Sequence, residues 1–171
     1  MSKRVSPGIL RAVVLRTASL LMMTAGLSLE LQAHEGAEGV IMDRMRIMTL
    51  YDAARLNIAA MIEGRIPYDG AKIKDYAHSI AERSGESLTQ LFPEGSLHDP
   101  SLASPLVWED WSAFTDLALE LQVRAVLLEK SAGSDSTVGD ATADGNGASS
   151  LAEAYDKLVE TCDTCHARFR N

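Results

Sequence analysis

The sequence predicts an all-α protein whose helices pack as an antiparallel four-helix bundle. Four segments repeat apolar residues at spacings of i, i+3, i+4 and i+7, which is the period of one helix face. No segment shows the convincing alternation of apolar and polar residues that is typical of a half-buried strand. Once a predicted leader is removed, 138 residues remain, and this length suits one domain with one hydrophobic core.

The predicted leader covers residues 1–33. Four basic residues precede an uncharged stretch at residues 17–29, and the small residue Ala33 closes the segment. Thirteen residues are too few to cross a hydrocarbon core of ~30 Å at ~1.5 Å per residue. The pattern therefore indicates a secretory signal peptide. We expect the mature chain, residues 34–171, to be periplasmic, with no stable membrane insertion after cleavage.

The mature chain is strongly acidic. Removing residues 1–33, which hold four basic residues and one acidic residue, takes the formal net charge from −8 to −11. Nucleic-acid binding requires clustered Lys and Arg, so no nucleic-acid partner is expected. The acidity itself favours solubility and says little about a specific partner.

The first two helices are predicted at about residues 38–64 and 69–91. Gly64 and Pro67 do not easily continue the first helix, and "FPEGS" ends the second. The connection between them is short, so these helices should be antiparallel neighbours. Their apolar faces consist of Ile41, Met45, Met48, Tyr51, Ile58 and Ile62 in the first, and Ile73, Tyr76, Ile80, Ser84, Leu88 and Leu91 in the second.

The third helix is predicted to begin near Ser104, with Pro105 at its first position, and the fourth at Ser150. Ser150 and Glu153 have the spacing of a capping box. Residues 131–149 are rich in Gly, Ser, Asp and Ala and predict a flexible surface loop. The two faces consist of Trp108, Trp111, Thr115, Ala118, Leu121, Ala125 and Leu128, and of Leu151, Ala154, Tyr155, Leu158, Val159, Cys162, Cys165, His166 and Phe169.

The two cysteines of the chain, Cys162 and Cys165, are followed at once by His166. A dithiol of the thioredoxin kind opens a helix after a strand, whereas this motif lies near the end of a helix. A zinc site needs four ligands, and adjacent Cys165 and His166 cannot easily point at one tetrahedral metal. A disulfide is sterically poor at this spacing within a regular helix.

Covalent haem attachment fits the motif better than these alternatives. Cys-x-x-Cys-His is the attachment signature for c-type haem. Two thiols three residues apart lie on one side of a helical turn, where each can form a thioether with a haem vinyl group. His166 then reaches the iron. Export supports this prediction, because c-type haem is attached outside the cytoplasm. We expect one covalently attached haem c, with its iron, per chain.

At this point the chain resembles a known family over about residues 38–171. "CDTCHARFR" in the last helix, together with "DRMRIM", "GRIPYD", "LFPEGS" and "SPLVWEDWSAF", is similar to the class II c-type cytochromes. These include cytochrome c′ and its low-spin relatives, and the resemblance implies a helical bundle around one haem. The stretch at residues 131–149 is longer and lower in complexity than the family leads us to expect.

The resemblance also implies a sixth ligand of the iron. In low-spin members a methionine of the first helix binds opposite the histidine, and "DRMRIM" places Met48 at that position. A Met/His ligand pair raises the reduction potential. From the residues alone, Met42, Met45 and Met48 all lie in the first helix, and Met45 and Met48 share its core-facing side. Each of them could equally be a core methionine that fills a gap.

Two arginines are expected to contact the haem. The resemblance implies that Arg44, one turn before Met48, pairs with a haem propionate, and that Arg170, one turn after His166, contacts the haem edge similarly. The remaining side chains of interest are given a packing or surface role. We expect Trp108, Trp111, Phe114, Tyr155 and Phe169 to pack, and His34, His78 and His98 to lie at the surface.

Two functions follow from these expectations. The first is a periplasmic electron carrier, not an enzyme, whose iron is bound by His166 and Met48 and whose redox partners dock transiently. The alternative is a five-coordinate cytochrome of the c′ type that binds nitric oxide or carbon monoxide at the open haem face. A homodimer through the first two helices is compatible with the resemblance.

Overall fold

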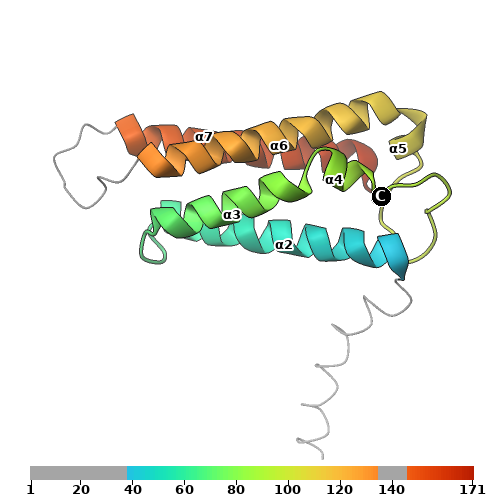
Figure 1. Cartoon of the computed structure of the whole chain (residues 1–171), viewed down its shortest axis with the longest axis horizontal. Helices are drawn as coiled ribbons and strands as arrows, with labels where there is room; N and C mark the ends of the chain where they lie inside the picture. Colours follow the sequence, from blue (N-terminus) through green and yellow to red (C-terminus); the bar gives the residue numbers. More distant parts are fainter. Residues whose placement is uncertain (1–37, 135–145) are drawn as a thin grey trace, which may run out of the picture. The chain divides into compact units, whose positions relative to one another are not determined.

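The computed structural model describes residues 38–134 and 146–171, and its regular structure there is helical (Figure 1). Helix α2 packs beside α3, α3 beside α6, and α6 beside α7, so the predicted four-helix bundle is confirmed. No strand forms within these residues, although an isolated bridge joins Ala103 to Arg170. The helices are α2 (Gly39–Ile62), α3 (Gly70–Arg83), α4 (Glu86–Thr89), α5 (Leu106–Glu109), α6 (Trp111–Ser134) and α7 (Asn146–Phe169).

The predicted helix at residues 69–91 is wrong in its continuity, because α3 ends at Arg83, with Ser84 as its C-cap, and α4 begins after Gly85. Gly85 has a φ of +60°, which favours glycine, and its amide donates to the Ala118 carbonyl at 2.9 Å. A Cβ at this position would lie 2.6 Å from Oε1 of Gln122. The break therefore lets the chain approach α6 more closely than a continuous helix would.

The third predicted helix is also divided. The hydroxyl of Ser104 accepts from the amide of Leu106 at 3.1 Å, so the expected cap exists, but it opens only the four-residue α5. Asp110 then leaves helical geometry, and its carboxylate accepts from the amide of Ala113 at 3.3 Å. Asp110 thus caps α6, which runs as a separate helix through the core.

The fourth helix begins earlier than predicted. Helix α7 starts at Asn146, so Ser150 and Glu153 lie inside it and do not form its capping box. Helix α6 continues to Ser134, so both ends of the predicted loop at 131–149 are helical. The middle of that loop, 135–145, and the predicted leader, 1–33, lie outside the described residues.

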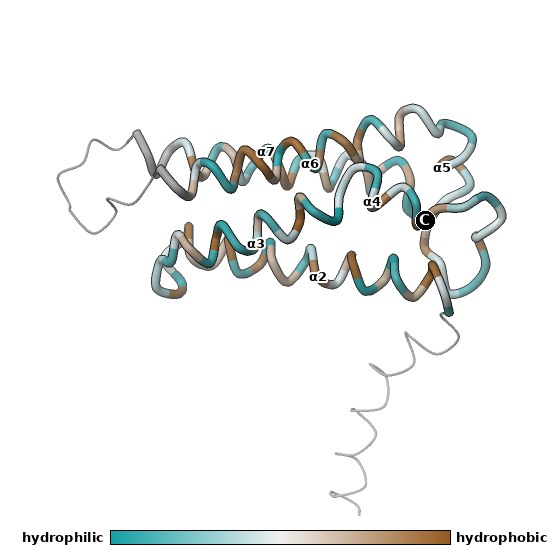
Figure 2. The backbone as a smooth tube through the Cα atoms, viewed as in Figure 1, coloured by the Kyte–Doolittle hydropathy of each residue, from teal (hydrophilic) through white to brown (hydrophobic). Residues whose placement is uncertain are grey.

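The buried side chains form two clusters, and apolar positions recur along each helix between polar ones (Figure 2). Ile47 and Met48 of α2 pack against both clusters, so they mark the junction between them. The aliphatic cluster consists of Tyr51, Ala54, Ile58, Met61, Ile73, Ala77, Ile80, Ala81, Leu121, Ala125, Leu128, Ala132, Leu151 and Leu158. The aromatic cluster consists of Leu88, Phe92, Val107, Phe114, Ala118 and Phe169.

None of the helices in the described part of the chain has the length and apolar character that a membrane span requires.

Candidate functional site

Helix α7 carries the two cysteines at the junction of the two clusters. Cys162 packs against the aliphatic cluster and Cys165 against the aromatic cluster. Both are half-buried free thiols, and their spacing of three places them on one side of the helix. The structure therefore brings them to the same junction as Ile47 and Met48 of α2.

The protonation of these thiols argues against redox chemistry. Burial raises the pKa of Cys162 to about 11 and the pKa of Cys165 to about 11. Both groups are therefore neutral thiols near pH 7, whereas a reactive dithiol needs a lowered pKa. Across the described ranges, no group of three or more His, Cys, Asp or Glu side chains is arranged to hold a metal ion. The geometry thus gives no support to the dithiol or the zinc alternative.

His166 lies on the exposed side of the last turns of α7. Partial burial of the ring, and then the charge of Arg170, lower its pKa, against an opposite effect of Asp163. Its imidazole makes no hydrogen bond within residues 38–134 and 146–171. A neutral imidazole with uncommitted nitrogens is suited to bind iron.

Met48 differs from the other methionines of α2 in where it packs. It is half-buried and contacts both clusters, whereas Met42 and Met45 belong to neither contact set. The structure therefore separates Met48 from Met45, which the sequence places on the same helix face. The free thiols of Cys162 and Cys165 and the free imidazole of His166 are the groups that a covalently held haem needs. Met48 adds an apolar side chain from α2 at the same junction.

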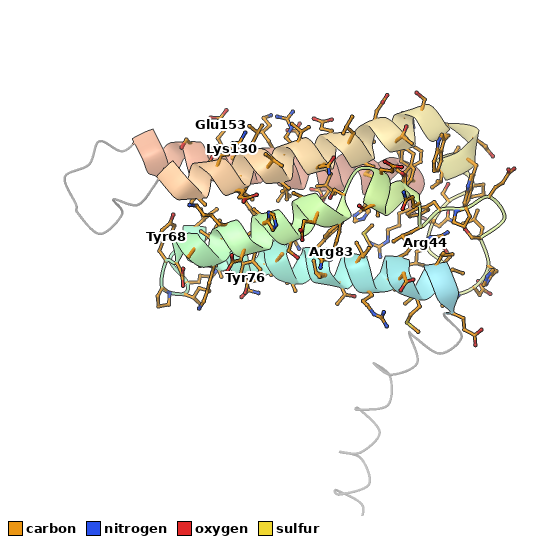
Figure 3. All side chains as sticks on the ribbon, in the orientation of Figure 1. Arg44, Tyr68, Tyr76, Arg83, Lys130 and Glu153 are labelled. Carbon is orange, nitrogen blue, oxygen red and sulfur yellow. The ribbon has the colours of Figure 1, made fainter. Side chains whose placement is uncertain are left out.

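Arg44 is buried on α2, with only 5% of its surface exposed (Figure 3). Its Nε donates to the Leu91 carbonyl at 2.5 Å, and its Nη1 to the Ser96 carbonyl at 2.9 Å. Its Nη2 donates to the Ser96 hydroxyl, and its Cζ lies 4.2 Å from the centre of the Phe92 ring. Burial lowers the pKa of this guanidinium. Arg44 thus fastens the segment after α4 to α2.

The contacts of Arg44 bear on its predicted role without testing it. No carboxylate pairs with its guanidinium among the described side chains, so a propionate partner stays a prediction. The sequence did not reveal the contacts of Arg44 with Leu91 and Ser96, because these residues lie 47 and 52 residues away along the chain. The motif "LFPEGS" pointed to this segment, but no local pattern signals its contact with α2.

The end of α7 is held by the segment before α5. The Ser104 amide donates to the Phe169 carbonyl at 2.8 Å, and the Asn171 amide to the Leu102 carbonyl at 2.9 Å. Arg168 forms an ion pair with Asp110. These contacts fix the turn that carries His166, and sequence reasoning did not find them. The exposed side chain of Arg170 makes no hydrogen bond within the described part of the chain, so its haem contact stays a prediction.

The packing and surface predictions hold only in part. The rings of Phe114 and Phe169 are buried and meet edge-to-face at 5.4 Å, as expected. Trp111 is 40% exposed and packs only at the edge of the core, with its ring centre 5.6 Å from that of Phe114, because Asp110 restarts the helix and Phe114 takes the inward position. His78 is exposed but lies 3.3 Å from the carboxylates of both Glu82 and Glu129.

The remaining residues predicted to pack or to lie at the surface are Trp108, Tyr155, His98 and His34. The indole of Trp108 donates to the Phe92 carbonyl at 3.1 Å. The Tyr155 hydroxyl donates to the Arg55 carbonyl at 3.3 Å. His98 is exposed, with Nδ1 3.2 Å from the Asp99 carbonyl oxygen, and His34 lies outside the described residues. Trp108 and Tyr155 therefore tie helices and loops together.

Comparison with known proteins gives matches to cytochromes c′ and to a cytochrome c-554 from Cereibacter sphaeroides, which is 26% identical over 136 residues. A family model described as Cytochrome C' matches residues 39–170. A cytochrome c′ from Rhodopseudomonas palustris is 30% identical over 132 residues, covering 77% of this chain and 81% of that protein. A cytochrome c′ from Cereibacter sphaeroides is 26% identical over 164 residues, covering 94% of this chain and 98% of that protein.

A solved structure agrees with these sequences. The structure of cytochrome c′ from Rhodopseudomonas palustris superimposes with a TM-score of 0.65 and 27% identity. The match covers 79% of this chain and 98% of the solved one. The arrangement of the helices and the terminal Cys-x-x-Cys-His motif therefore indicate the same family.

Proposed function

We propose that the haem iron of this protein is five-coordinate and that its open face binds a diatomic gas such as nitric oxide or carbon monoxide. The premise is that the chain belongs to the cytochrome c′ family. The family holds one covalently attached haem c with its iron, and this chain carries the attachment motif in its last helix. In this proposal His166 is the single protein ligand of the iron, and Met48 lines the opposite, distal face.

In this proposal the residues of α7 hold the haem and those of α2 line its distal side. Cys162 and Cys165 hold the group through thioether bonds on one side of α7, and His166 gives a ring nitrogen to the iron. Bound haem supplies an iron that changes oxidation state and accepts a further ligand. Met48 and Ile47 of α2, which pack against both clusters, would give the distal side an apolar lining that disfavours charged ligands.

The packing of Met48 is compatible with a core role that needs no bond to the iron. Its side chain contacts both clusters, as expected for a core methionine that closes the junction. The family match, to cytochromes c′, gives the five-coordinate proposal more support than the six-coordinate electron carrier expected from the sequence. The proposal keeps a non-enzymatic role and a periplasmic location, supported by the predicted leader at residues 1–33.

Replacing Met48 separates the two coordination states. In the five-coordinate protein Met48→Ala leaves the spectrum high-spin. Because Met48 lines the distal face, its removal should let carbon monoxide bind at least about tenfold faster, which corresponds to a barrier lower by about 1.4 kcal/mol. Stopped-flow mixing of the reduced holoprotein with the gas measures the rate.

Met45→Ala is the matched control, because Met45 lies on the same helix but packs against neither cluster. It should change neither the spin state nor the rate. A wild-type protein that is low-spin, and that Met48→Ala makes high-spin, would instead establish Met48 as the sixth ligand. The same conversion in Met45→Ala would place the distal residue one turn earlier.

A further inference from the structure

Tyr51 places a polar group inside the aliphatic cluster. Its side chain is buried, and its hydroxyl oxygen lies 3.1 Å from Oγ of Ser84, which is also buried. A buried polar group needs a hydrogen-bond partner, because an unpaired one is costly. The pair joins α2 to the end of α3, the helix beside it (Figure 1). Neither the attachment of haem nor the binding of iron requires this pair.

The direction of this hydrogen bond follows from the other partner of Ser84. The serine hydroxyl has a single hydrogen, and it donates that hydrogen to the Ile80 carbonyl at 2.7 Å. Tyr51 is therefore the donor in the pair, and Ser84 is the acceptor. Burial raises the pKa of Tyr51 to about 12, so the phenol keeps its hydrogen near pH 7.

Ser84 is a firmly held acceptor for this bond. It is the C-cap of α3, and the amide of the next residue, Gly85, donates to the Ala118 carbonyl of α6 at 2.9 Å. The side-chain amide of Gln122, also on α6, donates to the Ala81 carbonyl at 3.3 Å. Helix α6 thus holds the end of α3 on both sides of Ser84, and the phenol fastens α2 to that end.

Met48 lies between this bond and the contacts of Arg44 on the same helix. Arg44 lies four residues before Met48 and Tyr51 three residues after it, so the three side chains follow one face of α2. Met48 packs against the cluster to which Tyr51 belongs. Arg44 joins α2 to the segment after α4, whereas Tyr51 joins it to the end of α3. The part of α2 that carries Met48 is therefore held on both sides.

We propose that Tyr51 is a positioning residue of the distal face, whose hydrogen bond to Ser84 fixes the turn of α2 that carries Met48. This inference rests on the proposed function, because it concerns how closely Met48 approaches the open face of the iron. The one hydrogen of the phenol is committed to Ser84, so Tyr51 acts through Met48 and donates no hydrogen bond to the gas. Loss of the bond lets this turn of α2 shift and opens the distal side.

Tyr51→Phe tests this role, because it removes the hydroxyl and leaves the ring in the cluster. The Ser84 hydroxyl keeps its bond to the Ile80 carbonyl, so no buried donor loses its partner. We expect carbon monoxide to bind the reduced holoprotein about three- to tenfold faster, since one neutral hydrogen bond contributes about that factor. Stopped-flow mixing measures the rate. Ser84→Ala, which removes the acceptor, should change the rate in the same direction.

Tyr155→Phe is the matched control. Tyr155 also donates a single hydrogen bond to α2, to the Arg55 carbonyl at 3.3 Å, but Arg55 lies about two turns beyond Met48. This variant should leave the rate unchanged. In a Met48→Ala background Tyr51→Phe should have no further effect on the rate, because the side chain that it positions is gone. A purely structural role would lower the stability in both backgrounds and leave the rate unchanged.

Hydrogen exchange of the backbone amides adds a readout that does not depend on how the iron is coordinated. Tyr51→Phe should speed exchange at residues 44–51 more than elsewhere in α2. A low-spin wild type that ignores carbon monoxide overturns the proposed function, while this faster exchange would still support the positioning of Met48. In a protein that binds the gas, an unchanged rate overturns the inference, as does a rate effect that Tyr155→Phe shares or that persists after Met48→Ala. Unchanged exchange at residues 44–51 overturns it in either case.

Discussion

The aliphatic and the aromatic cluster are built in different ways. The aliphatic cluster joins side chains from the four long helices, all at regular helical spacing. The aromatic cluster is assembled from α4, α5, the loop at Phe92 and the ends of α6 and α7. Polar contacts from Arg44, Trp108 and Ser104 fix its pieces. The difference teaches that regular helix packing gives this chain its stability, while the haem-site end depends on breaks and specific hydrogen bonds.

The largest expected effect on stability comes from the aliphatic cluster. Ile58 is fully buried there, and Ile58→Ala removes its side chain from a packed site. We expect the free energy of unfolding to fall by about 2–5 kcal/mol, measured by urea denaturation. The haem spectrum of the folded variant should not change. A shifted spectrum with little loss of stability would mean that the two clusters are not separate in function.

A smaller loss of stability, joined to a change at the haem, is expected for Arg44→Met. This variant leaves the carbonyls of Leu91 and Ser96 without their charged donor. Hydrogen bonds to a charged group contribute about 1.5–3 kcal/mol each, and relief from burying the charge offsets part of this. We expect a net loss of about 2–4 kcal/mol, with a changed reduction potential and faster proteolysis at residues 91–101.

The control for Arg44→Met is Arg46→Met on the same helix. Arg46 is exposed and contacts only Asp43 at 3.5 Å, so the variant should cost less than about 1 kcal/mol and leave the potential unchanged. Equal effects of the two variants would show that Arg44 acts only through its charge.

The smallest of these effects concerns the break between α3 and α4. Gly85→Ala meets a φ of +60° and the Gln122 side chain 2.6 Å away, and should cost about 1–3 kcal/mol in thermal or chemical unfolding. Gly95→Ala has a similar φ of +81° but open space around it. The difference between the variants therefore measures the crowding at Gln122. If Gly95→Ala is as costly, backbone strain alone explains the effect.

The sequence predicts the two clusters unequally well. The helical period located the faces that build the aliphatic cluster, because burial repeats every three to four residues in a long helix. The same period continues across Gly85, since Ser84 and Leu88 remain in phase, so the break left no trace in the pattern. Gly85 itself was the available signal, as Asp110 was for the start of α6.

The candidate site shows the same limit. The motif at Cys162, Cys165 and His166 is local, and "DRMRIM" selected the methionine that the structure places beside both clusters. The partners of Arg44 and the ties that hold the end of α7 join residues distant in sequence. Such contacts follow from the packing of the whole chain, and no local spacing encodes them.

The central claim is that the iron of this protein has one protein ligand, His166, and an open face beside Met48. The most direct test is the optical spectrum of the reduced wild-type holoprotein before and after carbon monoxide is added. A five-coordinate iron predicts a high-spin spectrum that shifts when the gas binds. A low-spin spectrum that carbon monoxide leaves unchanged would contradict the claim and indicate that Met48 is the sixth ligand of the iron.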